Sequence, residues 1–307
     1  MGAQLRVVKR RIKSVHATKK ITRAMELIAA SRIVKAQQRL NSTMPYTLEL
    51  NRALTAAASN TSTVSDHPLI STHIGRDRAA LLVITSDRGL AGAYSSNAIR
   101  EAQALTALLV DEGYEVVPYV VGRKGEGWFR FRGRAVARSW TGISDQPTYE
   151  AATEIADAVL ERFLQPTSEG GADEIHIVYT HFVSMVTQQV RVRRVLPLEV
   201  VEEREEHSEG GRPLEPLYDF EPSAEAVLDA LLPKYVRTIV YSALLESAAS
   251  EHSARRRAMK AATDNADDLI KSLTRQANAA RQAEITQEIS EIVGGADALS
   301  SATAGKE

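Results

Sequence analysis

The sequence predicts an α/β protein in which a globular domain lies between two long helices that pair as an antiparallel coiled coil. Three observations lead to this prediction. Both ends of the 307-residue chain carry a narrow apolar stripe at heptad-like spacing. The middle of the chain alternates short apolar runs with helical patterns, which is typical of α/β domains. The two ends share one pattern although they are far apart in the sequence, so pairing them buries both stripes.

The C-terminal helix is predicted over residues 234–293. It follows Pro233 and contains neither proline nor glycine, and we expect Gly294 and Gly295 to end it. A helix of this span extends about 90 Å. It is longer than a small domain is wide, so it requires a partner helix or enclosure by other chains. Its stripe consists of Leu269/Ile270, Leu273, Ala277, Ala280, Ile285, Ile289 and Ile292.

The N-terminal helix is predicted over residues 1–58, and Pro45 is expected to kink it or to start a new turn. The polar run from Ser59 to Asp66 then forms a loop. If the helices pair, cysteines at facing positions such as Ile21 and Ala261 are expected to cross-link. The stripe consists of Leu5, Val8, Ile12, Val15, Ile21/Thr22, Met25, Ile28/Ala29, Ile33, Ala36 and Leu40.

The globular domain is predicted over residues 76–200. Strands are expected over residues 79–85, 116–121, 136–140, 174–180 and 188–197, and helices over residues 93–112, 123–131 and 148–164. This order, β-α-β-α-β-α-β-β, predicts a Rossmann-like, mainly parallel sheet that closes with a hairpin. Pro118 indicates an edge strand or a bulge at the second strand, because proline cannot donate a ladder hydrogen bond.

Three polar stretches link or end these parts. Residues 165–172 are interpreted as a flexible connector that tolerates shortening. Residues 201–233 are interpreted as an acidic loop followed by a short helix, which Ser223 caps and Pro233 ends. Residues 294–307 are expected to form a flexible tail.

The net charge of −1 hides a strong segregation of charge. Residues 1–40 hold eleven Lys and Arg against Glu26 alone, whereas residues 199–225 hold ten acids against Arg204 and Arg212. A basic helical arm is typical of proteins that bind nucleic acid or membrane phosphates. It is equally typical of a shaft that runs past acidic partner surfaces, and composition leaves both readings open.

No stretch of the sequence indicates catalysis or a bound cofactor. Asp87–Gly92 follows a strand as a phosphate loop would, but the glycine spacing of dinucleotide and P-loop sites is missing, so a structural turn is expected. The histidines lack metal-ligand spacing. The chain has no cysteine, which excludes disulfides and thiolate chemistry, and no apolar run long enough to cross a membrane.

Both ends of the chain resemble the gamma subunit of rotary F-type ATP synthases. IKSVHATKKITRAMELIAASR near the start and AMKAATDNADDLIKSL near the end are similar to that family, as is the closing run Ile285-Thr286-Gln287-Glu288 with Glu291 and Gly295-Ala296. SDRGLAGAYSSN in the middle is similar to the family's first βα turn. The resemblance is close over about a third of the chain and rests on topology elsewhere.

The resemblance implies a central-stalk subunit that transmits rotation of a membrane c-ring to catalytic beta subunits, and so couples proton flow to ATP synthesis. The chain itself would be non-catalytic and would bind no cofactor. The implied partners are the alpha and beta subunits of the catalytic hexamer, the epsilon subunit and the c-ring, with no nucleic acid. The implied location is the cytoplasmic face of the bacterial cell membrane, where the chain would be held peripherally.

Five residues are implied as coupling or partner contacts by their match to the family. Met25 matches a methionine near the acidic lever loop of the beta subunit, and Arg255 and Gln282 match its polar partners on the C-terminal helix. Glu288 and Glu291 match acids of the closing signature. Met25, Arg255 and Gln282 are expected to share one contact region.

Two other classes of protein remain as alternatives. A basic coiled-coil adaptor or nucleic-acid-associated protein would use the N-terminal arm and bind nucleic acid in a salt-sensitive manner. A small α/β nucleotide enzyme would bind its ligand at Asp87–Gly92.

Overall fold

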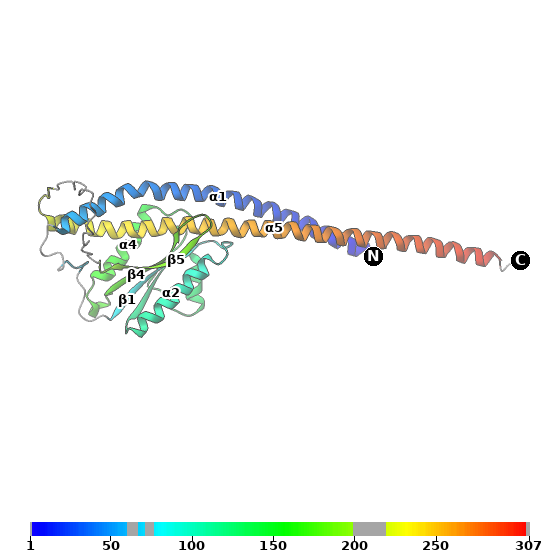
Figure 1. Cartoon of the computed structure of the whole chain (residues 1–307). Coiled ribbons are helices and arrows are strands. Elements are labelled where there is room, and N and C mark those ends of the chain that lie inside the picture. Colours follow the sequence, from blue (N-terminus) through cyan, green and yellow to red (C-terminus); the bar gives the residue numbers. More distant parts are fainter. Residues whose placement is uncertain (1, 60–66, 71–76, 199–218, 305–307) are drawn as a thin grey trace, which may run out of the picture. The chain divides into compact units, whose positions relative to one another are not determined.

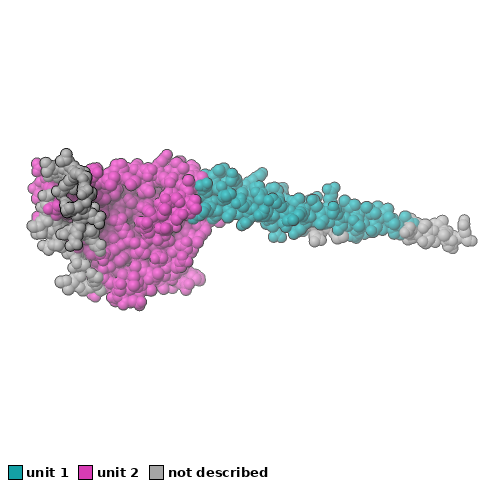
Figure 2. Space-filling model, viewed as in Figure 1, with its two compact units in different colours: residues 1–28, 256–307 teal, residues 29–255 magenta. Residues whose placement is uncertain are grey.

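The computed structural model describes residues 2–59, 67–70, 77–198 and 219–304. The chain divides into two compact units, residues 1–28 with 256–307 and residues 29–255 (Figure 2). Its elements, in order, are α1 (Gly2–Ser59), β1 (Arg78–Ile84), α2 (Tyr94–Asp111), β2 (Glu115–Val121), α3 (Arg123–Phe131), β3 (Arg138–Trp140), α4 (Tyr149–Leu164), a 3-10 turn (Thr167–Glu169), β4 (Glu174–Phe182), β5 (Gln188–Leu196) and α5 (Ala224–Ala304) (Figure 1).

The unit 29–255 is built on a five-stranded sheet of order β3-β2-β1-β4-β5. β1 pairs in parallel with β2 and β4, and β2 pairs in parallel with β3. β5 pairs antiparallel with β4. The predicted sequence of strands and helices, the parallel sheet and the closing hairpin are therefore confirmed.

Helices cover both faces of this sheet, and the alternation of side chains along β1 shows how. Ala80 and Leu82 belong to the large core that α4 and the first half of α5 complete. Leu81 and Val83 belong to a separate cluster with Ala102 of α2. A strand buried on both faces is expected to be continuously apolar, which is the pattern from which it was predicted.

The long helices differ from the prediction at their ends. α5 begins at Ala224, passes through Pro233 and continues beyond Gly294 and Gly295 to Ala304, so both a short helix ending at Pro233 and a stop at the glycines are wrong. Leu228, Leu232, Val236 and Val240, four residues apart, all lie in the large core, so the buried face continues across the proline. The two glycines are not among the residues with positive φ, the conformation that ends a helix. α1 likewise passes through Pro45 as one element.

Pro118 does not mark an edge strand, because β2 lies between β1 and β3. Pro118 pairs with Leu81 of β1. The carbonyl oxygen of Pro118 accepts a hydrogen bond from Ala137 N, just before the short β3 begins. Within a strand the N–H and C=O of one residue point to the same side, so the missing N–H faces the end of β3, where no ladder partner requires it.

Residues 165–172 form a tight hydrogen-bonded turn, so their interpretation as a flexible connector is wrong. The N–H groups of Glu169 and Gly171 donate to Pro166 O, and Ala172 N donates to Arg162 O. Ala172 is buried. These bonds close the link between α4 and β4, so shortening it removes packed backbone.

Gly171→Ala is expected to destabilise the chain by about 2 kcal/mol, because a Cβ there would lie 1.9 Å from the carbonyl oxygen of Gln165. The measurement is the free energy of unfolding in urea. Gly127→Ala is the matched control, since Gly127 lies in α3 with no atom within 4 Å of an added Cβ, and alanine favours a helix. Equal effects of the two substitutions would contradict this account of the turn.

In the unit formed by residues 1–28 and 256–307, α1 and α5 pair antiparallel. The hydroxyls of Thr22 and Thr263 lie 2.8 Å apart, and Lys19 pairs with Asp267, so residue numbers that rise along α1 meet residue numbers that fall along α5. Met259, Thr263, Ala266, Leu273 and Ala277 are the buried positions of α5 here. The stripe predicted for α1 is confirmed except at Ile21 and Ile28, which are exposed beside the contact positions Thr22 and Ala29, whereas Leu269 of the stripe predicted for α5 is exposed.

Cysteines at Thr22 and Thr263 are expected to form a disulfide under mild oxidation without loss of helix content. The hydroxyl oxygens they replace already touch across the helix pair. Electrophoresis without reductant measures the cross-link through the changed mobility of the closed chain. Ile21→Cys with Ala261→Cys, the pair named from the sequence, serves as the control: both residues are exposed, so against the sequence expectation this pair should not close readily. A control that closes as fast would show that the register differs.

α5 extends past the start of α1 in this unit. Its stripe residues Ile285, Ile289 and Ile292 are exposed by 45%, 56% and 71%, whereas Leu273 is buried.

None of the described helices combines the length and apolarity needed to cross a membrane. The acidic stretch 202–216 and the loop 60–66 lie outside the described residues. The predicted division into a shaft and a globular domain stays a prediction.

Candidate functional site

The segment of α5 around Ser247 lies at the carboxyl ends of β1 and β4. Tyr94 Oη donates to Ser247 O at 3.1 Å, Thr180 N donates to Ser247 Oγ at 3.3 Å, and Ser250 Oγ donates to Thr180 O at 3.0 Å. Ser247, Ala248, Ala249 and Ser250 are all buried. Their small side chains let the helix approach the strand ends closely.

In open α/β sheets, ligands bind at the carboxyl ends of the strands where the strand order reverses. Here the order reverses at β1, which has β2 on one side and β4 on the other. The helix segment that contains Ser247 and Ser250 occupies this place and satisfies its polar groups. The sheet therefore uses its usual ligand site to hold a helix.

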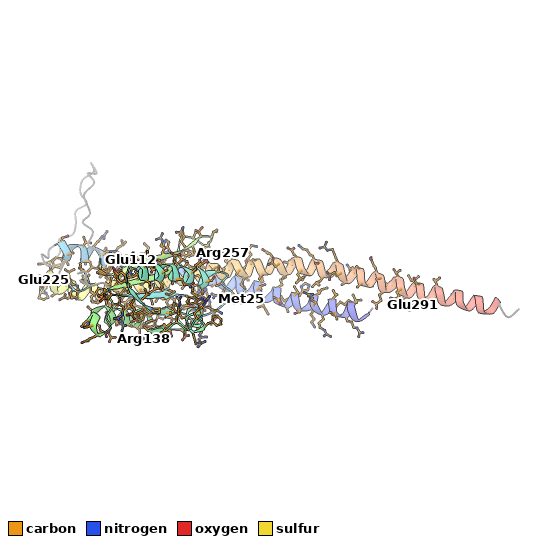
Figure 3. All side chains as sticks on the ribbon, turned by 90° about the horizontal axis from the view of Figure 1, so that it is seen from below. Met25, Glu112, Arg138, Glu225, Arg257 and Glu291 are labelled. Atoms are coloured by element: carbon orange, nitrogen blue, oxygen red, sulfur yellow. The ribbon has the colours of Figure 1, made fainter. Side chains whose placement is uncertain are left out.

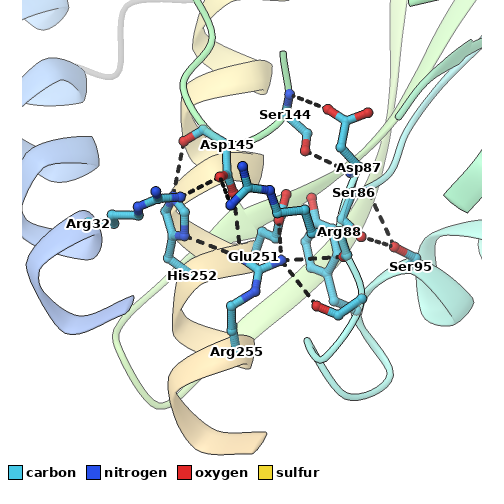
Figure 4. Close-up of polar contacts among 12 residues, drawn as sticks. Arg32, Ser86, Asp87, Arg88, Ser95, Ser144, Asp145, Glu251, His252 and Arg255 are labelled. Carbon is cyan, nitrogen blue, oxygen red and sulfur yellow. Dashed lines mark hydrogen bonds and ion pairs between the residues drawn. The ribbon is translucent and has the colours of Figure 1, made fainter. Parts of the chain in front are cut away.

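A polar cluster continues this contact one turn further along α5. It joins α5 to α1, to the turn after β1 and to the loop before α4 (Figure 4). We call it the Asp145 cluster; its members are Arg32, Arg88, Asp145, Glu251, His252 and Arg255.

Asp145 is the centre of this cluster. Its Oδ2 pairs with Arg32 Nη1 and lies 3.5 Å from Arg88 Nη1, and its Oδ1 lies 3.6 Å from Arg255 Nη1. Its backbone oxygen accepts from His252 Nε2 at 3.0 Å. One carboxylate thus neutralises guanidinium groups from three separate segments of the chain.

Arg255 is buried and ties α5 to the turn after β1. Its Nη2 donates to Glu251 Oε1 at 2.6 Å and to the carbonyl oxygens of Arg88 and Gly89 at 3.3 and 3.4 Å. A guanidinium presents its donors in a planar fork, which suits a carboxylate on one side and backbone carbonyls on the other.

Burial changes the protonation of two members of the cluster. It raises the pKa of Glu251 to about 7, against the opposing attraction of Arg255. It lowers the pKa of His252, and the hydrogen bond to Asp145 O offsets this only in part. A neutral His252 that donates from Nε2 leaves Nδ1 to accept from Arg255 Nη1 at 3.4 Å.

The turn Asp87–Gly92 is held by hydrogen bonds within the chain. Asp87 accepts from the backbone N–H groups of Ser144 and Arg123. Burial raises the pKa of Asp87, but these backbone bonds and one from Gly142 outweigh it, so the pKa lies below its usual value. The Asp87 carboxylate thus binds the loop before α4, and the carbonyl oxygens of Arg88 and Gly89 bind α5. These are the contacts of a structural turn.

The predicted contact residues fall into two environments. Arg255 is part of the buried Asp145 cluster. Met25 is half-buried, and Gln282, Glu288 and Glu291 are exposed; Figure 3 labels Met25 and Glu291. Glu291 accepts a hydrogen bond from Gln287 Nε2 at 2.8 Å. Their contacts with partner subunits, and the single contact region expected for Met25, Arg255 and Gln282, stay predictions.

Sequence reasoning missed Arg32, Asp145, Glu251 and His252 as site residues. The spacing of Glu251 and Arg255, four positions apart on a helix, was a usable signal for an ion pair. Nothing local marks Asp145, because its partners lie far away in the sequence. Within the described residues no group of three His, Asp or Glu side chains is placed to hold a metal ion; His176 pairs with Glu174 and His181 with Glu246.

Comparison with known proteins gives one consistent family. A family model described as ATP synthase matches residues 4–299. The ATP synthase gamma chain of Thermobifida fusca is 60% identical over 307 residues and covers all of both chains. That of Kineococcus radiotolerans is 62% identical over 301 residues, 98% of each chain.

Solved structures give the same fold. The central stalk and c-ring structure of the Tetrahymena thermophila mitochondrial ATP synthase contains a chain that matches with a TM-score of 0.57 and 27% identity, over 79% of this chain and 99% of that one. A chain of the Euglena gracilis mitochondrial ATP synthase matches with a TM-score of 0.66 over 100% of this chain and 97% of that one. Its identity of 18% shows likeness of fold alone.

Proposed function

The chain belongs to the family of ATP synthase gamma chains, and from this premise we propose that it is the rotor shaft of a proton-translocating ATP synthase. It transmits rotation of the membrane c-ring to the beta subunits, where ATP is made, and does no chemistry itself. The observation that carries the proposal is the identity of about 60% with named gamma chains over the whole chain.

The structure supplies what a shaft requires. α1 and α5 pair antiparallel, which makes a helix pair stiffer than either helix alone, and α5 is fixed to the sheet through Ser247, Ser250 and the Asp145 cluster. A torque applied to the sheet then passes to α5 through packed backbone and buried ion pairs. These observations support the role of a shaft but do not identify the partner subunits.

The partners we propose are the alpha and beta subunits of the hexamer, the epsilon subunit and the c-ring. Met25, Gln282, Glu288 and Glu291 are proposed to contact them, because all four are at least partly accessible. For Arg255 we propose an indirect role, through the Asp145 cluster that buries it. The complex is membrane-associated, and we place this chain on the cytoplasmic face.

Purification of the tagged chain from solubilised membranes tests the proposal. Mass spectrometry should identify the alpha, beta, epsilon and c subunits, and the purified complex should pump protons on ATP hydrolysis once in vesicles. A chain truncated after Ala280 is the matched comparison, since it keeps the buried helix pair and loses the exposed tip of α5. Recovery of nucleic acid that high salt removes, with no alpha or beta subunit, would favour the adaptor alternative instead.

A further inference from the structure

We propose that Glu251 is a proton-responsive positioning residue: with a proton on its carboxyl group, the contact between α5 and the Asp87–Gly92 turn is closed, and loss of that proton favours opening of the contact. This inference rests on the proposed function only for its consequence, the transmission of torque. The contact itself lies within the unit 29–255.

The geometry around Glu251 leaves one of its oxygens without a hydrogen-bond partner. Oε1 accepts from Arg255 Nη2, but Oε2 is buried and unpaired among the described residues. Asp145 Oδ1, in the same cluster, is also buried without a hydrogen-bond donor. An ionised Glu251 holds its charge in a buried site where Arg255 and Ser144 compensate it only in part, whereas a proton on Oε2 removes that charge and adds a donor.

Glu251 faces titratable or charged groups from every element around it. Burial opposes its ionised form and raises the pKa; Arg255 favours that form by its charge and a hydrogen bond, Asp145 repels it, and a hydrogen bond from Ser144 favours it. Among the described residues, Arg255, Asp145, Ser144 and Tyr94 interact with Glu251. The groups next to these are His252 on α5, Asp87 and Arg88 in the turn after β1, Thr180 on β4 and Arg32 on α1.

The sign of the pH effect follows from the linkage of protonation to opening. The pKa of Glu251 is about 7 in the closed contact, against an ordinary value of 4.5 in water. The closed form therefore binds the proton more tightly, and its advantage is lost as the pH rises from 4.5 through 7. Between pH 6 and pH 8, the opening equilibrium is expected to shift toward the open form by about tenfold.

Opening would matter because Arg255 holds the turn to α5 only while its guanidinium stays between Glu251 and the carbonyls of Arg88 and Gly89. Release of this contact lets the helix move relative to the strand ends. Torque would then be transmitted less completely at alkaline pH than at neutral pH.

Amide hydrogen exchange of the assembled complex, read by mass spectrometry, tests the proposal. The peptides that cover Asp87–Gly92 and Ser247–Arg255 are compared between wild type and Glu251→Gln at the same pH, which cancels intrinsic exchange. The wild-type to variant ratio of exchange rates should rise about tenfold from pH 6 to pH 8. Glu101→Gln, an exposed carboxylate on α2, should behave as wild type. A ratio that stays constant overturns the proposal.

Two further measurements keep the assignment to Glu251 open to refutation. Exchange that loses its pH dependence in His252→Gln, and keeps it in Glu251→Gln, would overturn the role of Glu251. If Glu251→Gln does not fold, titration of the wild-type chain carrying ¹³C at the Glu carboxyl carbons replaces it. One resonance should then titrate near pH 7, and a spectrum in which every Glu titrates below pH 6 contradicts the proposal.

The functional consequence has its own readout. The ratio of proton pumping to ATP hydrolysis in wild type, relative to Glu251→Gln, should fall as the pH rises from 6 to 8. If the complex assembles and the ratio of pumping to hydrolysis, wild type relative to Glu251→Gln, does not change with pH, the inference is wrong but the proposed function stands. A chain that never assembles with alpha and beta subunits sinks the proposed function as well.

Discussion

Asp145→Ala is expected to lower the free energy of unfolding by about 4 kcal/mol, one of the two largest effects we predict. The substitution leaves the buried guanidinium of Arg255 and the half-buried one of Arg32 without their shared carboxylate. Removal of one partner from a buried ion-pair network costs about 3–5 kcal/mol, because the remaining charges stay in a medium that solvates them poorly. Unfolding in urea measures the loss.

Asp268→Ala is the matched control. Asp268 also pairs with a cation, Lys271, but both side chains are more than 70% exposed. Pairs of this kind contribute little, so this change should stay within about 0.5 kcal/mol of wild type. In a second comparison, adding Arg32→Ala to Asp145→Ala should cost less than it does in the wild-type background. Additive costs would show that Asp145 does not hold Arg32.

Met25→Lys is expected to assemble and hydrolyse ATP but to pump far fewer protons per ATP. Met25 is half-buried in the helix pair beside Arg23 and Glu26, and if it faces the acidic loop of a beta subunit that the resemblance implies, a lysine there has a stem long enough to reach that loop. A new interfacial ion pair of a few kcal/mol, broken at each rotational step, would act as a brake. The temperature dependence of hydrolysis should therefore become steeper.

The measurement is the ratio of ATP-driven pumping to hydrolysis in membrane vesicles. Met25→Leu is the control, since it keeps the apolar side chain and should retain coupling. A compensating change is expected at Gln282, which is exposed, and not at Arg255, whose substitution would break the Asp145 cluster. An unchanged ratio in Met25→Lys would return Met25 to a residue of the helix contact alone.

The fold could be predicted from local patterns because each of its elements has a local cause. β1 is apolar from Ala79 to Ile84 since helices cover both faces, and Thr148 caps α4 by accepting from Ala151 N. The heptad-like stripe indicated the contact face of α1 to within one residue: Thr22 is buried where Ile21 was equally allowed. One position of error is the limit of such a pattern, because i and i+1 differ by only 100° around a helix.

The Asp145 cluster could not be predicted in this way. Arg32, Arg88, Asp145 and Glu251 come from four distant places, and only the sheet topology brings them together. Pro233 and Gly294 misled for a different reason. Both residues lower helix propensity, but propensity gives way to packing at Pro233, where the core face continues on either side.

The unpaired end of α5 has a consequence for how the molecule is made. Among the described side chains from Ile285 to Ala296, the isoleucines are exposed, so backbone bonds and side-chain pairs such as Gln287 with Glu291 are what favour the helical form there. Isolated helices of this length are marginal in water. We therefore expect this end to fray in the isolated chain, and its conformational entropy would be lost if partner subunits enclose it on assembly. Binding of partner subunits around this end would then complete the folding of the chain, and burial of its exposed isoleucines would drive that step.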